Sequence, residues 1–169
     1  IGPYEVVRPL GRGGQGAVYE VRARDDPRRL ALKRAEGALT AEEALRFERE
    51  GQLLARLRLP GLVAVHGAGR DEAGRPFLVL EHLEGTTLDA LAPLPPARAA
   101  ALVREVAETV ASLHAAGVVH RDLTPRNVTL VRRADGRERP VLIDLGLARA
   151  DDGRGLTTTG TVLGTPGYL

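Results

Sequence analysis

The sequence predicts an α+β fold in which strands dominate the first half and helices follow in the second. Up to about residue 81, short apolar runs alternate with clusters of glycine, proline and charged residues, a pattern typical of strands joined by turns. A single helical segment interrupts these runs. After residues 84–87 the apolar positions change to the three- and four-residue spacing of a helix.

The first half contains five strand-like runs, at residues 4–10, 17–23, 30–34, 62–69 and 76–81. The helical segment between the third and the fourth run covers residues 40–57. It opens with Thr40 and Glu43, which have the spacing of a capping box, so each side chain can accept a hydrogen bond from the other residue's backbone amide. Strong helix formers follow, and we therefore expect a helix here.

The second half opens with a longer helix, predicted over residues 97–116. Two prolines precede it and Gly117 ends it. Its core-facing positions fall on one stripe, formed by Leu102, Val106, Thr109 and Leu113. Two short apolar runs, 128–131 and 140–143, follow with a polar turn between them, and we expect both to be strands.

The composition argues against several classes of function. The 24 basic and 22 acidic residues are spread along the chain, with three tyrosines and two phenylalanines, so nothing indicates nucleic-acid binding. Without cysteine there is no disulfide or thiolate metal site, which suits a cytoplasmic location. No run of the sequence has the length and apolarity of a membrane span or the pattern of a signal peptide. Because methionine is absent, we expect a piece of a longer protein.

Three glycines, Gly11, Gly13 and Gly16, lie between the first two strand-like runs. Glycine lets a hairpin tip approach a polyanion and offer its backbone N–H groups, so the spacing indicates a phosphate-binding loop. Plain turns and dinucleotide-binding folds show the same spacing, but in the latter a helix follows. Because residues 17–21 have the pattern of a strand, we favour a loop folded over phosphates.

Lys33 is the only lysine among 24 lysines and arginines. Either the sequence favours arginine and this one lysine has no special role, or Lys33 lies in a site where a compact ammonium fits and a planar guanidinium does not. Glu50 lies on the apolar seam of the first helix, between Phe47 and Leu54. A carboxylate there needs a cation such as Lys33, unless the helix is rotated so that Glu50 reaches water.

Two carboxylates and an amide stand near the ends of the last two strand-like runs. Asp122 and Asn127 lie five residues apart in the loop after the long helix, and Asp144 follows the final run. Each acid alone can be a turn former. Together they form an oxygen-rich set at adjacent strand ends, which favours Mg²⁺ over zinc.

These motifs resemble those of the eukaryotic-like serine/threonine protein kinases of bacteria. They occur in the family's order along the whole chain: "GRGGQGAV", "LALK", Glu50, "HRDLTPRN", "DLG" and "GTPGYL". The resemblance implies a two-lobed fold, with a complete strand-rich lobe at 1–83 and an incomplete helical lobe at 84–169. It also implies transfer of the γ-phosphate of ATP to serine or threonine hydroxyls of proteins, including the enzyme itself.

The resemblance implies a role for each site residue. Asp122 would be the catalytic base, and Lys33, paired with Glu50, would hold the α and β phosphates. Asn127 and Asp144 would hold Mg²⁺, with Mn²⁺ as an alternative. A larger set from the glycine-rich loop, the strands, the hinge and the pocket floor would contact ATP: Gly11, Arg12, Gly13, Gly14, Gln15, Gly16, Val18, Ala31, Lys33, Leu80, Glu81, Leu83 and Thr129.

Three departures from the family pattern qualify these expectations. Thr124 stands where serine/threonine kinases usually carry a catalytic lysine, and Arg126, at a position where tyrosine kinases carry arginine, is expected to supply the missing charge. Thr129 replaces a larger apolar residue in the floor of the adenine pocket. The sequence stops at Leu169, where the family continues with "APE" and further helices, an absence that can leave the chain by itself unstable or inactive.

Two other functions are compatible with parts of the pattern. A pseudokinase keeps the fold as a nucleotide-binding scaffold, but it usually loses the lysine, the base or the metal aspartate, and all three are present here. Small-molecule phosphotransferases of related fold share the aspartate and asparagine loop but lack a "GTPGYL" segment. We therefore favour the protein kinase.

The last segment predicts a switch controlled by phosphorylation. Thr157, Thr158, Thr159 and Thr161 lie in a glycine-rich stretch, and a phosphate there adds about two negative charges that Arg121 can bind. We expect mass spectrometry of the full-length protein, incubated with ATP and Mg²⁺, to find phosphate on at least one of the four. An unchanged rate after replacement of all four by alanine would rule the switch out.

Overall fold

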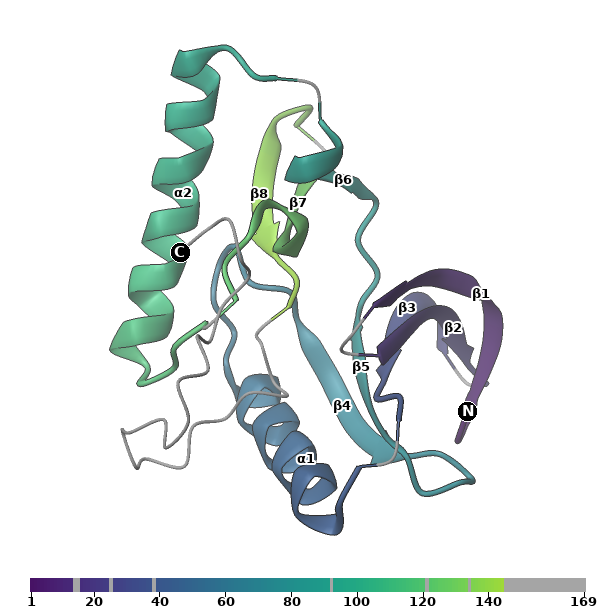
Figure 1. Cartoon of the computed structure of the whole chain (residues 1–169). Helices are drawn as coiled ribbons and strands as arrows, with labels where there is room; N and C mark the ends of the chain where they lie inside the picture. The colour runs from purple at the N-terminus through teal and green to yellow at the C-terminus, as the bar shows by residue number, and fades with distance from the viewer. Residues whose placement is uncertain are drawn as a thin grey trace. The chain divides into compact units, whose positions relative to one another are not determined.

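The computed structural model describes residues 1–13, 16–24, 26–37, 39–91, 93–120, 122–133 and 135–144, without the side chains of Glu42, Glu43, Arg46, Glu50 and Leu53. The chain divides into two compact units (Figure 1). The first consists of Ile1–Arg58 and Val63–Leu83, and the second of Leu59–Leu62 and Glu84–Leu169.

The first unit is built on a five-stranded antiparallel sheet with the order β1-β2-β3-β5-β4 (Figure 1). The strands are β1 (Tyr4–Gly13), β2 (Gly16–Ala23), β3 (Asp26–Arg34), β4 (Val65–Arg70) and β5 (Pro76–Glu81). All five predicted strand-like runs lie within or overlap these strands. The run expected at 62–69 begins as a strand only at Val65, because Leu62 instead forms a bridge to Leu142 of the second unit's sheet.

Side chains of successive residues in a strand point to opposite sides, which gives the sheet two different faces. One face carries the core of the first unit, formed by Val21, Leu30, Leu32, Phe77 and Val79. Helix α1 (Ala41–Arg56) packs on β4 and β5, next to Leu78, which points to the opposite face from Phe77 and Val79. Gly51 allows this approach, because a Cβ at that position would overlap the side chain of Leu78.

The second unit combines a long helix with a three-stranded antiparallel sheet of order β6-β7-β8. Its elements are β6 (Gly85–Thr87), the 3-10 helix η1 (Leu88–Ala90), α2 (Pro96–Ala115), the 3-10 helix η2 (Pro125–Asn127), β7 (Val128–Arg132) and β8 (Glu138–Leu142). The predicted stripe of α2 is confirmed: Leu102, Thr109 and Leu113 are buried, and Val106 is half-buried. Three-residue β6 was not predicted, because "GTT" has no apolar alternation.

Residues 59–62 are tied to α2 and β8 by hydrogen bonds. The backbone N–H of Leu142 donates to the carbonyl oxygen of Gly61 at 2.8 Å. The hydroxyl of Thr109 on α2 lies 3.3 Å from the carbonyl oxygen of Pro60 and 3.1 Å from that of Glu105. These contacts explain why four residues from the first half of the chain belong to the second unit.

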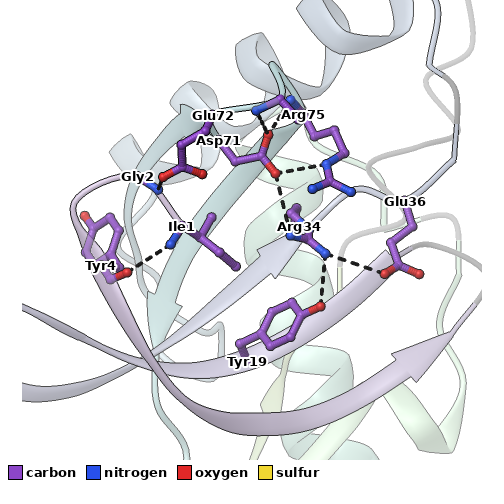
Figure 2. A network of polar contacts seen from close by, with 10 residues as sticks. Ile1, Gly2, Tyr4, Tyr19, Arg34, Glu36, Asp71, Glu72 and Arg75 are labelled. Carbon is purple, nitrogen blue, oxygen red and sulfur yellow. Dashed lines mark hydrogen bonds and ion pairs between the residues drawn. The ribbon is translucent and has the colours of Figure 1, made fainter.

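A polar network holds β3 to the β4–β5 turn, as Figure 2 shows. The carboxylate of Asp71 is 1% exposed and accepts hydrogen bonds from the backbone N–H groups of Ala73 and Arg75, at 3.0 and 2.9 Å, and from Nε of Arg75 at 2.9 Å. Arg34 of β3 lies 3.6 Å from the same carboxylate and donates to the hydroxyl of Tyr19. Asp71 therefore fastens the turn to the sheet.

Burial and these hydrogen bonds shift the pKa of Asp71 in opposite directions. Burial raises it, but hydrogen bonds from Arg75 and Ala73 together with the charge of Arg75 outweigh burial and hold the pKa below its usual value of 3.8. A carboxyl whose pKa is lower in the folded state stabilises the fold above its unfolded-state pKa, and this stabilisation is lost as the pH falls through the folded-state pKa.

We expect Asp71→Asn to lower the free energy of unfolding by about 1–3 kcal/mol at pH 7, because backbone and guanidinium donors lose a charged acceptor. Urea unfolding of the variant and the parent at several pH values measures this difference. It should shrink as the pH falls below about 4, where the parent loses the same charge. Asp135→Asn, at an exposed turn where Asp135 accepts the N–H of Arg137, is the control. A constant difference at all pH values would contradict the assignment.

Candidate active site

Four of the predicted nucleotide-binding residues share one face of the first unit's sheet. Val18 pairs with Lys33 and Lys33 with Leu78, while Ala31 pairs with Leu80. Residues paired across neighbouring antiparallel strands point to the same side. We call this side the Lys33 face. Lys33 itself is 7% exposed, so neighbouring atoms cover most of it and keep its ammonium from bulk water.

The glycine-rich hairpin connects β1 to β2. Gly13 pairs with Gly16 at its tip. A Cβ at Gly11 or Gly13 would have no described atom within 4 Å, whereas Gly16 has a φ of 130° and a Cβ there would overlap the carbonyl oxygen of Arg34. The hairpin end therefore lies close against β3, the strand that carries Lys33. Gly14 and Gln15, also predicted to bind the nucleotide, lie outside the described residues.

A buried carboxylate lies next to residues 81–83, the segment that the kinase resemblance identifies as the hinge. Glu20 of β2 is 3% exposed, and its two oxygens lie 2.7 Å from Nε of Arg29 and 2.8 Å from Nε of Arg8. His82, between Glu81 and Leu83, approaches the same carboxylate at 3.8 Å. The hydrogen bond from Arg29, against the effect of burial, lowers the pKa of Glu20. Sequence reasoning missed this cluster, because its members are far apart along the chain.

The predicted catalytic loop of the second unit is organised by Asn127. Its side-chain amide donates to the backbone oxygen of Asp122 at 2.7 Å and to a carboxylate oxygen of Asp122 at 3.2 Å. The backbone oxygen of Asn127 accepts the N–H of Ile143 at 3.0 Å, which brings the residue before Asp144 to the start of β7. The structure thus gathers Asp122, Asn127 and Asp144 at one end of the β7–β8 pair.

His120 lies beside these carboxylates. It is 3% exposed, and no described group forms a hydrogen bond with either of its ring nitrogens. Burial lowers the pKa of His120, opposed by the charges of Asp144 and Asp122.

The donor set fits a hard divalent cation. The NH₂ group of Asn127 faces Asp122, so the amide oxygen points away from that contact, and Asp144 adds carboxylate oxygens. In the part of the chain that the structure describes, no cluster of three or more acidic or histidine side chains could hold a metal ion by itself. Two carboxylates and an amide are the kind of ligand set that Mg²⁺ completes with water and phosphate oxygens.

Two further predicted residues have partners that the sequence did not suggest. Nε of Arg126 lies 3.1 Å from the carboxylate of Asp89 in η1, although the arginine side chain is 83% exposed. The hydroxyl of Thr87, more than the charge of Arg126, lowers the pKa of Asp89. Thr129 is buried in β7 between Thr87 and Val141 of the neighbouring strands.

Comparisons with known proteins identify the family of this chain. The family model of the protein kinase domain matches residues 4–169. The chain belongs to the protein kinase family. Members of this family use ATP and a divalent metal.

The protein kinase relatives are bacterial. The chain is 40% identical to the serine/threonine-protein kinase PknD of Mycobacterium tuberculosis, over 99% of this chain and 26% of that protein. It is 43% identical to PknJ of the same species, over 98% and 29%, and 39% identical to pkn2 of Myxococcus xanthus, over 99% and 21%. The chain therefore spans about a quarter of the length of these kinases.

Solved protein kinase structures confirm the fold. The PknI kinase domain of Mycobacterium tuberculosis matches with a TM-score of 0.73 and 33% identity, over 88% of this chain and 61% of that domain. The kinase fold expected from the sequence is therefore correct. Among the described helices, none combines the length and the apolar character that crossing a lipid bilayer requires.

Some of the site predictions concern residues that the structure does not describe. These are the side chain of Glu50, the hairpin residues Gly14 and Gln15, Arg121 and the threonines of residues 157–161. Their roles stay predictions from the sequence.

The contact between Gly16 and β3 generates a stability prediction. We expect Gly16→Ala to lower the free energy of unfolding by about 2 kcal/mol or more, because the methyl group overlaps a backbone oxygen and the φ is unfavourable for alanine. Gly13→Ala is the matched control and should change stability by about 0.5 kcal/mol or less. Urea unfolding of both variants makes the comparison, and equal effects would contradict the close approach of the hairpin to β3.

Proposed function

We propose that this chain is the nucleotide-binding and catalytic part of a serine/threonine protein kinase, which transfers the γ-phosphate of ATP to hydroxyl groups of proteins. The observation that carries the proposal is that Asn127 connects the loop of Asp122, through its side-chain amide, with the residue before Asp144, through its backbone oxygen. The names of the bacterial relatives support the serine/threonine class. Residues 1–83 and 84–169 would be the two lobes, and the site would work in the cytoplasm, where ATP is available.

The first unit would bind ATP. Lys33 would place its ammonium against the α and β phosphates, with Glu50 as its partner on α1, and the hairpin amides would cover the phosphates. Val18, Ala31 and Leu80 on the Lys33 face would contact the adenine. Glu81 and Leu83 of the hinge would hold its edge. Burial of Lys33 among neighbouring strands supports this role, because an ammonium that is kept from bulk water interacts more strongly with phosphate.

The second unit would perform the transfer. The Asp122 carboxylate, oriented by Asn127, would accept the proton of the substrate hydroxyl. The oxygen of that hydroxyl would form a bond to the γ-phosphorus, while the bond from this phosphorus to the bridging oxygen breaks and ADP leaves. Asn127 and Asp144 would hold Mg²⁺, or Mn²⁺ in its place, because oxygen donors suit both cations. When bound, the cation would neutralise charge on the phosphates. Thr129 would line the floor of the adenine pocket.

Arg126 would supply the cation that Thr124 does not provide. In the structure its guanidinium is paired with Asp89. To reach the transferring phosphate it must exchange that carboxylate for phosphate oxygens. The high exposure of the side chain supports this, because an ion pair in water costs little to open.

Incubation of the full-length protein with labelled ATP and Mg²⁺ tests the proposal. We expect label on a protein acceptor and none on sugar or aminoglycoside acceptors. Label on the small molecules would favour a small-molecule phosphotransferase, and ATP binding without transfer would favour a pseudokinase.

The Lys33→Arg variant, measured in the same assay, tests the role of Lys33. We expect the transfer rate to fall by about 100-fold or more, because a guanidinium keeps the charge but does not fit the place of the ammonium. Arg137→Lys, in the turn between β7 and β8, is the control for an arginine–lysine exchange at an exposed position. A rate within threefold of the parent would contradict the role of Lys33.

A further inference from the structure

An arginine of the glycine-rich hairpin lies on the face of the sheet opposite Lys33. Arg12 of β1 pairs with Ala17 of β2, and Ala17 pairs with Arg34 of β3. These three residues therefore point to the same side. Because Arg34 follows Lys33 directly, that side is the reverse of the Lys33 face. The side chain of Arg12 thus belongs to the face that would turn away from a nucleotide bound on the Lys33 face, so the contact with ATP that the resemblance implies for Arg12 would come from its backbone.

Arg12 reaches across β2 to the end of β3. Neighbouring strands lie about 4.8 Å apart, so a side chain from β1 must cross about 10 Å to reach a residue beside β3. The small side chain of Ala17 leaves this path open. Nε of Arg12 lies 2.7 Å from a carboxylate oxygen of Glu36, two residues after β3 ends. The hydrogen bond between them raises the pKa of Arg12 and lowers that of Glu36.

Glu36 is itself anchored to the rest of the first unit. Its other carboxylate oxygen lies 3.8 Å from Arg34, as Figure 2 shows. Arg34 in turn contacts Tyr19 and Asp71. The Glu36 side chain is 23% exposed, compared with 77% for Arg12. The fixed end of the ion pair is therefore Glu36, and the movable end is the hairpin.

On its β1 side, the described part of the hairpin has few other contacts near the tip. Gly11 and Gly13 have no side chains, and no described atom lies within 4 Å of where their Cβ atoms would be. β2 is itself paired with β3 as far as Ala17, so the backbone ladder fixes the β2 side of the hairpin, whereas the β1 side depends on its pairing with β2. The ion pair between Arg12 and Glu36 is a side-chain connection from β1, next to the tip, to the segment directly after β3, the strand of Lys33.

We propose that the Arg12–Glu36 ion pair is a strap that fixes the tip of the glycine-rich hairpin against β3 before ATP binds. It would set the distance between the hairpin amides and Lys33, the two groups expected to hold the phosphates. Glu36 is then a positioning residue that touches no nucleotide. The effect on ATP rests on the proposed kinase function, whereas the strap itself does not.

Hydrogen exchange on the ATP-free, full-length protein tests the strap without relying on activity. Arg12→Gln and Glu36→Gln should each speed amide exchange in residues 10–13 and 16–18 by about two- to fivefold, the range that an exposed ion pair can supply. The reversed pair, Arg12→Glu with Glu36→Arg, should restore slow exchange. Arg24→Gln, an exposed arginine at the other end of β2, is the control. Unchanged exchange in both single variants would overturn the proposal.

Kinetics then test the consequence for ATP. We expect the KM for ATP to rise about two- to fivefold in each single variant, with kcat changed less than about twofold. Salt at about 1 M should raise the KM of the parent and reduce its difference from the variants, because the pair is screened. Faster exchange with an unchanged KM would overturn the positioning role. A parent that neither binds ATP nor transfers phosphate would instead overturn the proposed function, while faster exchange would still support the strap.

Discussion

The antiparallel register of β1, β2 and β3 decides which side chains share a face of the first unit's sheet. In this register Val18 stands beside Lys33, and Ala17 stands between Arg12 and Arg34. A shift by one residue would move every one of these side chains to the other face. Lys33 would then point into the apolar cluster around Leu32 and Phe77, where an unpaired ammonium is costly. The core and the candidate site therefore impose the same register.

The second unit positions its site residues differently, because they lie in a short 3-10 helix and in loops next to the strands, not within a sheet. Asn127 connects the backbone and the carboxylate of Asp122, and its own backbone oxygen accepts a hydrogen bond from Ile143. Two strands of five residues each, β7 and β8, thus position a loop on one side and Asp144 on the other. Short strands suffice here because the buried Leu142 and Leu113 belong to a packed core.

Features that depend on local pattern could be predicted from the sequence. The strands around the glycines, the stripe of α2 and the loop containing Asp122 follow from apolar spacing and turn residues, and the structure has them. Contacts between distant charges could not be predicted. Arg12 and Glu36 are 24 residues apart and Arg126 and Asp89 are 37 apart, and nothing in the sequence distinguishes these acids from the other exposed ones. Such pairs become visible only when the register of the strands is known.

The exclusion of lysine from every other position has a consequence for chemical modification. Acylation of amines by reactive metabolites is spread over many surface lysines in most proteins, and it removes a charge wherever it occurs. In this chain the only side-chain amine is Lys33. Any lysine acylation within these 169 residues would therefore neutralise the cation expected to bind phosphate. Because Lys33 is only 7% exposed, its burial limits the access of acylating reagents to this amine. A nucleotide bound on the Lys33 face would shield that amine further.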